Sequence, residues 1–208
     1  MAARRLPFSL TRAEAHLRAA DAVLARLIDV HGRFLPRPGG DPYNSLLRTI
    51  LHQQLAGPAA RTIERRWRAL YGDEQTVPAP AAVLATSDEV FRSAGVSRQK
   101  AAYLRDLAAH VADGGLDFAA FARSTDDEVL QALTAVHGLG TWSAQMFLMF
   151  ELGRPDVLPV GDLGVRRGMQ LAYGLPEEPS LDRVREIGAA WAPYRSVGSW
   201  YMWRAVEG

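Results

Sequence analysis

The sequence of 208 residues contains no cysteine. Disulfide bonds, thiolate zinc sites, cysteine nucleophiles and iron–sulfur clusters held by cysteine are therefore excluded together. No apolar run approaches the roughly 20 residues of a membrane-spanning helix. The apolar run in the opening stretch MAARRLPFSL is too short for a secretory signal peptide. We therefore expect a cytoplasmic protein with no membrane partner.

Lysine is nearly absent as well, because Lys100 is the only lysine among 24 basic residues. Codon bias is the simpler explanation, although the arginine fork would also suit phosphate groups. The pI of about 8.2 does not by itself indicate a nucleic-acid-binding protein, since such domains often exceed a pI of about 9. With 48% apolar and 23% charged residues, the composition is that of a soluble globular protein.

Helical periodicity covers nearly the whole chain, and no segment shows the alternation or the hairpin signals of β-strands. Signals for helix starts recur at Thr11 with Glu14, Asp41 with Pro42, Gly57 with Pro58, Ser97, and Thr125 with Glu128. The first of these signals predicts one continuous helix over residues 11–28. The sequence therefore predicts an all-α fold.

Gly138 and Gly140 separate two apolar helices in VHGLGTWSAQMFLMF, residues 136–150. A helix that ends before them leaves carbonyls unpaired, and one that begins after them leaves amides unpaired. Glycine permits left-handed backbone angles and close approach of another backbone. The turn is therefore either a plain glycine-capped connection, which these residues alone favour, or a clamp whose amides bind one phosphate.

Asp162 also has two readings. It stands just before an apolar-periodic segment, so the residue alone indicates an N-cap, for which aspartate is among the best residues. The acidic run at residues 126–128 lies in the first turn of a helix, where the helix dipole favours negative charge. We interpret that run as structural.

Four segments, in this order, resemble the helix-hairpin-helix superfamily of DNA glycosylases. They are LLRTILHQQLAGPAARTI, GVSRQKAAYLRDLA, VHGLGTWSAQMF and LPVGDLGVRRG. The superfamily is marked by a hydrophobic-x-Gly-hydrophobic-Gly hairpin and a downstream Gly/Pro-rich loop that ends in an aspartate. Ala56 departs from the pattern, because the family usually has serine there. The resemblance covers roughly residues 41–174, and PYRSVGSWYMW extends it to the C-terminus.

The resemblance implies an all-α fold in which two helical lobes flank a DNA-binding groove, with the whole chain as one glycosylase unit. The expected parts are a first lobe including 41–114, a second lobe over 115–174 with the helix-hairpin-helix at 125–152 and the catalytic loop at 157–168, and flanking helices in 1–40 and 175–208 that pack together. With about forty residues before Asp41, we expect a compact form that lacks the N-terminal β-rich domain of the better-known alkylbase enzymes.

The resemblance also assigns roles to the two ambiguous features. The backbone amides of Gly138, Gly140 and Thr141 would bind a DNA phosphate. The main-chain carbonyls of Thr134, Val136 and Leu139 would hold a structural Na⁺ or K⁺. Asp162 falls on the catalytic aspartate, which would stabilise an oxocarbenium-like transition state and orient water. No cofactor for catalysis, zinc or iron–sulfur cluster is expected.

Trp142 occupies the position where bifunctional relatives carry the lysine that forms a Schiff base, so we expect a hydrolase without lyase activity. The same tryptophan marks the branch that resembles DNA-3-methyladenine glycosylase II, where it lines the base pocket. An indole face attracts cationic bases of the 3-methyladenine and 7-methylguanine type. Met146 and Trp203 would complete the pocket, with Trp200 as the alternative to Trp203.

The target base must leave the duplex, and the family match places the wedge that replaces it in HQQLAG. Either Gln54 or Leu55 would be the wedge, with Gln53 beside it at the minor groove. Arg166 and Arg167, one turn after Asp162, are candidates for contacts with phosphates.

These features together predict a monofunctional alkylbase glycosylase of base excision repair that acts as a monomer on damaged double-stranded DNA. Two alternatives stay open. One is a glycosylase for uracil or deaminated bases, and the other is a helix-hairpin-helix DNA-binding module without catalysis.

Overall fold

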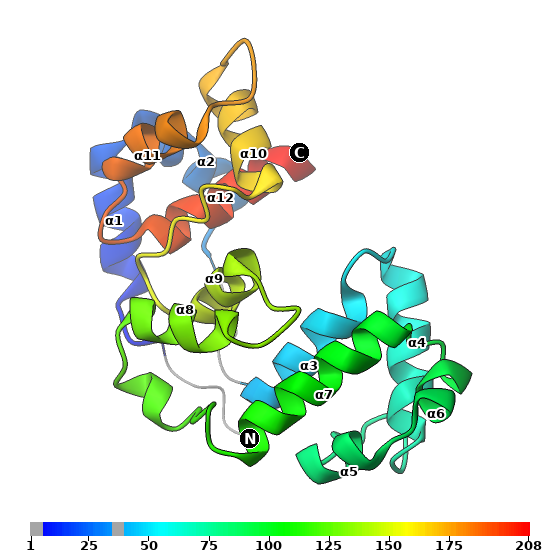
Figure 1. Cartoon of the computed structure of the whole chain (residues 1–208). Helices are drawn as coiled ribbons and strands as arrows, with labels where there is room; N and C mark the ends of the chain where they lie inside the picture. Colours follow the sequence, from blue (N-terminus) through cyan, green and yellow to red (C-terminus); the bar gives the residue numbers. More distant parts are fainter. Residues whose placement is uncertain (1–5, 35–39) are drawn as a thin grey trace. The chain divides into compact units, whose positions relative to one another are not determined.

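The computed structural model describes residues 6–34 and 40–208 (Figure 1). Every regular element within these two ranges is a helix, which confirms the predicted all-α class. The helices are α1 (Leu10–Ala20), α2 (Ala22–His31), α3 (Pro42–His52), α4 (Gly57–Ala69), α5 (Pro80–Ala85), α6 (Asp88–Ser93), α7 (Arg98–Ala112), the 3₁₀ turn η1 (Ala120–Ala122), α8 (Asp126–Thr134), α9 (Thr141–Phe150), α10 (Leu163–Tyr173), α11 (Leu181–Ala189) and α12 (Arg195–Glu207).

Internal contacts divide the chain into two compact units. Unit 1 combines the described residues before 35 with Leu148–Gly208, and unit 2 is Gly40–Phe147. The division differs from the expected boundary between residues 114 and 115. The hairpin after α8 is bonded to α7, which groups it with the helices that precede it. Residues 1–5 and 35–39 of the expected flanking segment lie outside the described residues.

Unit 1 has a core built from both ends of the chain. Leu17 of α1 and Leu24 of α2 are buried in the same cluster as Trp191 and as Tyr201 of α12. In Figure 1, α12 lies beside α10, and their backbones approach closely at Gly168. A Cβ there would lie 2.0 Å from the carbonyl oxygen of Met202. The start and end of the described chain therefore support the segment that carries Asp162.

The single helix predicted over residues 11–28 is wrong, because the chain breaks at Asp21. The Asp21 carboxylate accepts the Val23 amide at 2.8 Å and so begins α2. It also accepts the hydroxyl of Tyr173 and, at 3.0 Å, the indole N–H of Trp191. These two partners are distant in the sequence, and they draw Asp21 into the core of unit 1.

The capping box predicted from Thr11 and Glu14 is also wrong. Helix α1 already begins at Leu10, and Ser9 is its N-cap. Glu14 instead accepts a hydrogen bond from Arg33 at 3.0 Å. The other helix starts are confirmed: the side chains of Asp41 and Ser97 cap α3 and α7, Gly57 begins α4, and Thr125 with Glu128 forms the predicted box.

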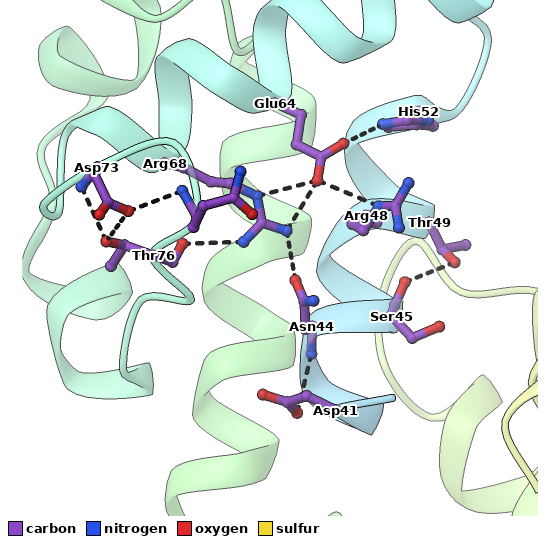
Figure 2. Close-up of polar contacts among 11 residues, drawn as sticks. Asp41, Asn44, Ser45, Arg48, Thr49, His52, Glu64, Arg68, Asp73 and Thr76 are labelled. Atoms are coloured by element: carbon purple, nitrogen blue, oxygen red, sulfur yellow. Dashed lines mark hydrogen bonds and ion pairs between the residues drawn. The ribbon is translucent and has the colours of Figure 1, made fainter. Parts of the chain in front are cut away.

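A polar network joins α3 to α4 within unit 2 (Figure 2). Glu64 of α4, with a side chain only 13% exposed, accepts from His52 at 2.7 Å, Arg68 at 2.8 Å and Arg48 at 3.2 Å. Burial acts to raise the pKa of Glu64, but the hydrogen bonds from His52 and Arg68 and the charges of both arginines outweigh it and lower the pKa. The network fixes the end of α3, from which the loop to α4 starts.

Candidate functional site

Asp162 stands at the N-terminus of α10, held from three directions. Its Oδ1 accepts the Val165 amide at 2.7 Å, as an N-cap does. The same oxygen accepts the indole N–H of Trp203 at 2.8 Å. The Asp162 amide donates to the Pro159 carbonyl at 2.9 Å, which closes the turn before the helix. The carboxylate is therefore fixed at the N-terminus of α10.

Trp203 lies directly against the start of α10. A Cβ on Gly164 would come within 2.6 Å of its Cδ1, so only glycine allows the indole to lie this close. The other ring neighbour is Phe150 at the end of α9, with centroids 5.8 Å apart. Trp200, the alternative pocket residue, instead packs on Phe34 and Tyr201 at 5.2 and 4.9 Å. Of the two tryptophans, Trp203 is the one in contact with Asp162.

The loop that leads to Asp162 is attached to the first turn of α12, a contact that the sequence did not reveal. Ser196 Oγ donates to the Arg154 carbonyl at 2.7 Å and accepts the Val157 amide at 2.9 Å. Arg195 forms a bidentate pair with Asp156 at 2.7 and 2.8 Å. Burial acts to raise the pKa of Asp156, but the bonds from Arg195 outweigh it and lower the pKa. The first turn of α12 thus holds the loop, and the same helix carries Trp203.

The hairpin glycines of unit 2 have different surroundings. Gly138 has a φ of +93°, and a Cβ on it would lie 2.3 Å from Cγ of Tyr103 on α7. Gly140 has no atom within 4 Å of the corresponding point. The His137 amide donates to Asp106 Oδ2 at 2.7 Å, and its ring meets the Tyr103 ring edge-on at 4.9 Å. Packing against α7 therefore requires Gly138, whereas Gly140 faces open space.

The candidate wedge residues lie in the loop Gln53–Ala56, between α3 and α4. The Gln53 side chain does not project outward, because its Nε2 donates to the Gly138 carbonyl at 2.8 Å. Gln54 is exposed and has a φ of +57°. Leu55 follows, with 37% of its surface exposed. The loop therefore presents Gln54 and Leu55 outward and holds Gln53 against the hairpin.

The remaining candidates fall on both units. Trp142, which is 51% exposed, and the half-buried Met146 lie one turn apart on α9, in unit 2. Arg166 braces a turn of its own unit, because it donates to the Pro179 carbonyl at 3.1 Å. Arg167 is exposed and donates to Gln170. Arg167 is therefore the better placed of the two arginines for a phosphate contact.

The described residues contain no group of three or more His, Asp or Glu side chains arranged to hold a metal ion. Within the same ranges, no helix combines the length and the hydropathy that crossing a membrane requires.

Residues 47–193 match the model of the HhH-GPD superfamily of base excision DNA repair proteins. The chain belongs to this superfamily. The matched range contains the candidate wedge residues, the hairpin glycines and Asp162, while Trp203 lies beyond it.

The HhH-GPD chain is also similar to individual glycosylases. It is 32% identical to DNA-3-methyladenine glycosylase 1 of Schizosaccharomyces pombe over 203 residues, which cover 96% of this chain and 89% of that protein. The solved structure of the S. pombe 3-methyladenine DNA glycosylase Mag1 in complex with abasic DNA superposes with a TM-score of 0.84, at 29% identity, over 95% of this chain and 97% of that chain. A DNA-3-methyladenine glycosidase from Bacillus halodurans gives a TM-score of 0.85, at 38% identity, over 95% and 91% of the two chains.

Proposed function

We propose that this HhH-GPD protein is a monofunctional alkylbase DNA glycosylase. It would hydrolyse the N-glycosidic bond of 3-methyladenine- and 7-methylguanine-type bases in damaged double-stranded DNA. The observation that carries the proposal is the carboxylate of Asp162, fixed between the first turn of α10 and the indole of Trp203. The substrate class is supported by relatives that are named 3-methyladenine glycosylases and that are similar to this chain over nearly its full length.

Asp162 is the proposed catalytic residue. As the bond between C1′ and the base nitrogen breaks, the base takes the electron pair and positive charge develops on the sugar. A carboxylate held in place stabilises that charge more in the transition state than in the ground state. The same carboxylate can orient the attacking water, which adds to C1′ and loses a proton. The Val165 and Trp203 bonds keep Oδ1 in place, so little reorganisation accompanies the reaction.

Trp142 is the proposed face for the extruded base. Its half-exposed indole, at the start of α9, offers a π surface, and alkylation at the purine ring gives the base the positive charge that such a surface attracts. Met146 lies one turn further along the helix. The only lysine, Lys100, donates to two main-chain carbonyls, which supports base release by water without a Schiff base.

The hairpin is the proposed phosphate contact, through the amides at Gly138, Gly140 and Thr141. The carbonyls of Thr134, Val136 and Leu139 are the proposed ligands of a monovalent cation. Main-chain oxygens are hard donors that suit such ions. The Val136 carbonyl already accepts the Leu139 amide at 3.1 Å, which leaves it one lone pair for the ion.

The test of the catalytic role is Asp162→Asn compared with Asp162→Ala. Asparagine keeps the oxygen that accepts from Val165 and Trp203, so its thermal stability should be near wild type. Alanine loses the cap and should cost about 0.5–2 kcal/mol of stability. Both variants should lose single-turnover excision of 7-methylguanine by about 10²-fold or more, while DNA binding persists. Near-normal excision by the asparagine variant would remove Asp162 from the catalytic role.

A further inference from the structure

Gln54 has an unusual backbone conformation. Among the described residues it is the only non-glycine with a positive φ, at +57°. Such a conformation is strained for a residue with a Cβ atom and persists only where the surroundings impose it. The loop's own bonds are long, with the Gln53 amide 3.4 Å from the Ile50 carbonyl and the Leu55 amide 3.3 Å from the His52 carbonyl. The conformation of Gln54 must therefore be imposed from outside the loop.

Shorter bonds reach the loop from two other elements. Lys100 of α7 donates from Nζ to the carbonyls of Leu51 and Gln53, at 2.6 and 2.8 Å. The Gln53 side chain donates to the Gly138 carbonyl of the hairpin at 2.8 Å. Gln53 is thus held by its own carbonyl and by its side chain, immediately before Gln54.

A lysine is well suited to this position. The last carbonyls of α3 have no intrahelical partners and lie at the negative end of the helix dipole. An ammonium carries three donors and can satisfy two such carbonyls at once. Burial lowers the pKa of Lys100, because the amine lies between elements and is partly removed from water.

We infer that Lys100 and Gln53 are positioning residues, which hold Gln54 in the left-handed conformation from which its side chain enters the duplex in place of the extruded base. The inference rests on the proposed glycosylase function and selects Gln54 over Leu55 as the wedge. The bond from Gln53 to Gly138 also links the wedge to the proposed phosphate-binding hairpin within unit 2. Binding of a phosphate at the hairpin would therefore fix the depth at which Gln54 enters the base stack.

The first test replaces Lys100 with methionine, which keeps the length of the side chain and removes its donors. Excision of 7-methylguanine is measured under single-turnover conditions from a fully paired duplex and from a bulge in which the base has no partner. The paired substrate requires the wedge most, so its rate should fall by about tenfold, and the bulged substrate should lose much less. Lys100→Arg should restore part of the loss, and Arg98→Met, at an exposed position of the same helix, controls for the lost charge.

The second test uses Gln54→Gly, which removes the wedge and also relieves the positive φ. This variant should melt at a higher temperature than wild type and show the same selective loss on paired DNA. The double variant Lys100→Met/Gln54→Gly should lose no more selectivity than Gln54→Gly alone, because both changes affect one step. Gln53→Leu removes the hydrogen bond to Gly138. If Lys100→Met does not fold, Gln53→Leu is used in its place as the test of the positioning role.

Each outcome identifies which claim fails. Equal losses on paired and bulged DNA for Lys100→Met would make the lysine merely structural and overturn the inference. A selective loss for Gln54→Gly without one for Lys100→Met and Gln53→Leu would keep the wedge and reject the positioning role. No selective loss for Gln54→Gly would reject both. Wild-type protein that releases no methylated base from either substrate would instead refute the proposed function.

Discussion

Replacement by alanine should destabilise the fold at Gly138 but not at Gly140. At Gly138, a side chain must adopt a φ of +93° and place its Cβ 2.3 Å from Tyr103 Cγ. The left-handed conformation costs roughly 1–2 kcal/mol and the overlap about 1–3 kcal/mol, so Gly138→Ala should destabilise the fold by about 2–5 kcal/mol. At Gly140 nothing lies within 4 Å, so Gly140→Ala should change stability by no more than about 0.5 kcal/mol.

Thermal unfolding measures the loss of stability expected for Gly138→Ala, and a DNA-binding assay measures the effect expected for Gly140→Ala. In a chain of this size, 1 kcal/mol shifts the Tm by about 2–4 °C, so Gly138→Ala should melt about 4–20 °C below wild type. Gly140→Ala should melt normally but bind DNA several-fold more weakly, because its methyl group would occupy the space through which a phosphate approaches. The loss should be equal for damaged and undamaged DNA, since phosphate contacts carry no sequence information.

The Tyr103→Ala background separates the two parts of the Gly138 cost. There the overlap with the ring disappears, while the backbone strain and a 2.9 Å approach to Cβ of residue 103 remain. Gly138→Ala should therefore cost clearly less than in wild type, but no less than the strain of about 1–2 kcal/mol. A full penalty in that background would show that Tyr103 does not impose the glycine. Normal DNA binding by Gly140→Ala would refute the close approach of a phosphate at that residue.

Two further predictions concern the base pocket and the polar network of Figure 2. Trp142→Ala should lose about 0.5–2 kcal/mol more transition-state stabilisation on 7-methylguanine than on neutral hypoxanthine. If the folded variant loses single-turnover activity equally on both bases, the cation–π role is rejected. The pKa of Glu64 is lowered from 4.5 in the folded state, so its ionised form stabilises the fold at neutral pH and this contribution is lost as the pH falls below about 4.5. Glu64→Gln should therefore unfold at a lower urea concentration than wild type at pH 7. If the difference between the two urea midpoints does not narrow toward pH 3, the ionised form of Glu64 does not stabilise the fold.

Local signals in the sequence predicted most helix starts, because a cap and its amide partner lie within three residues of each other. The predictions at Asp41, Ser97 and Thr125 needed nothing else. The break at Asp21 could not be predicted in this way. Its indole partner, Trp191, lies 170 residues away, and periodicity alone continued the helix through it.

The candidate site shows the same limit. The sequence placed Asp162 both at a helix start and at the family's catalytic position, and the cap is confirmed. It could not reveal that Trp203 donates to the same carboxylate oxygen, since that contact joins residues 41 positions apart. No motif in the sequence assigns a role in the site to Lys100. Its two acceptors are main-chain carbonyls 47 and 49 positions away. A pattern of side chains in the sequence cannot predict such contacts.

The departure at Ala56 affects how the loop before α4 is held. Ala56 is the N-cap of α4 and makes no side-chain bond to that helix, so the cap that a serine would supply, typically about 1 kcal/mol, is missing. Pro58 offsets part of the loss, because its ring preorganises the first turn and it has no amide to satisfy. The loop is therefore fixed weakly on the side of α4 and firmly on the side of α3, where Lys100 and Gln53 act.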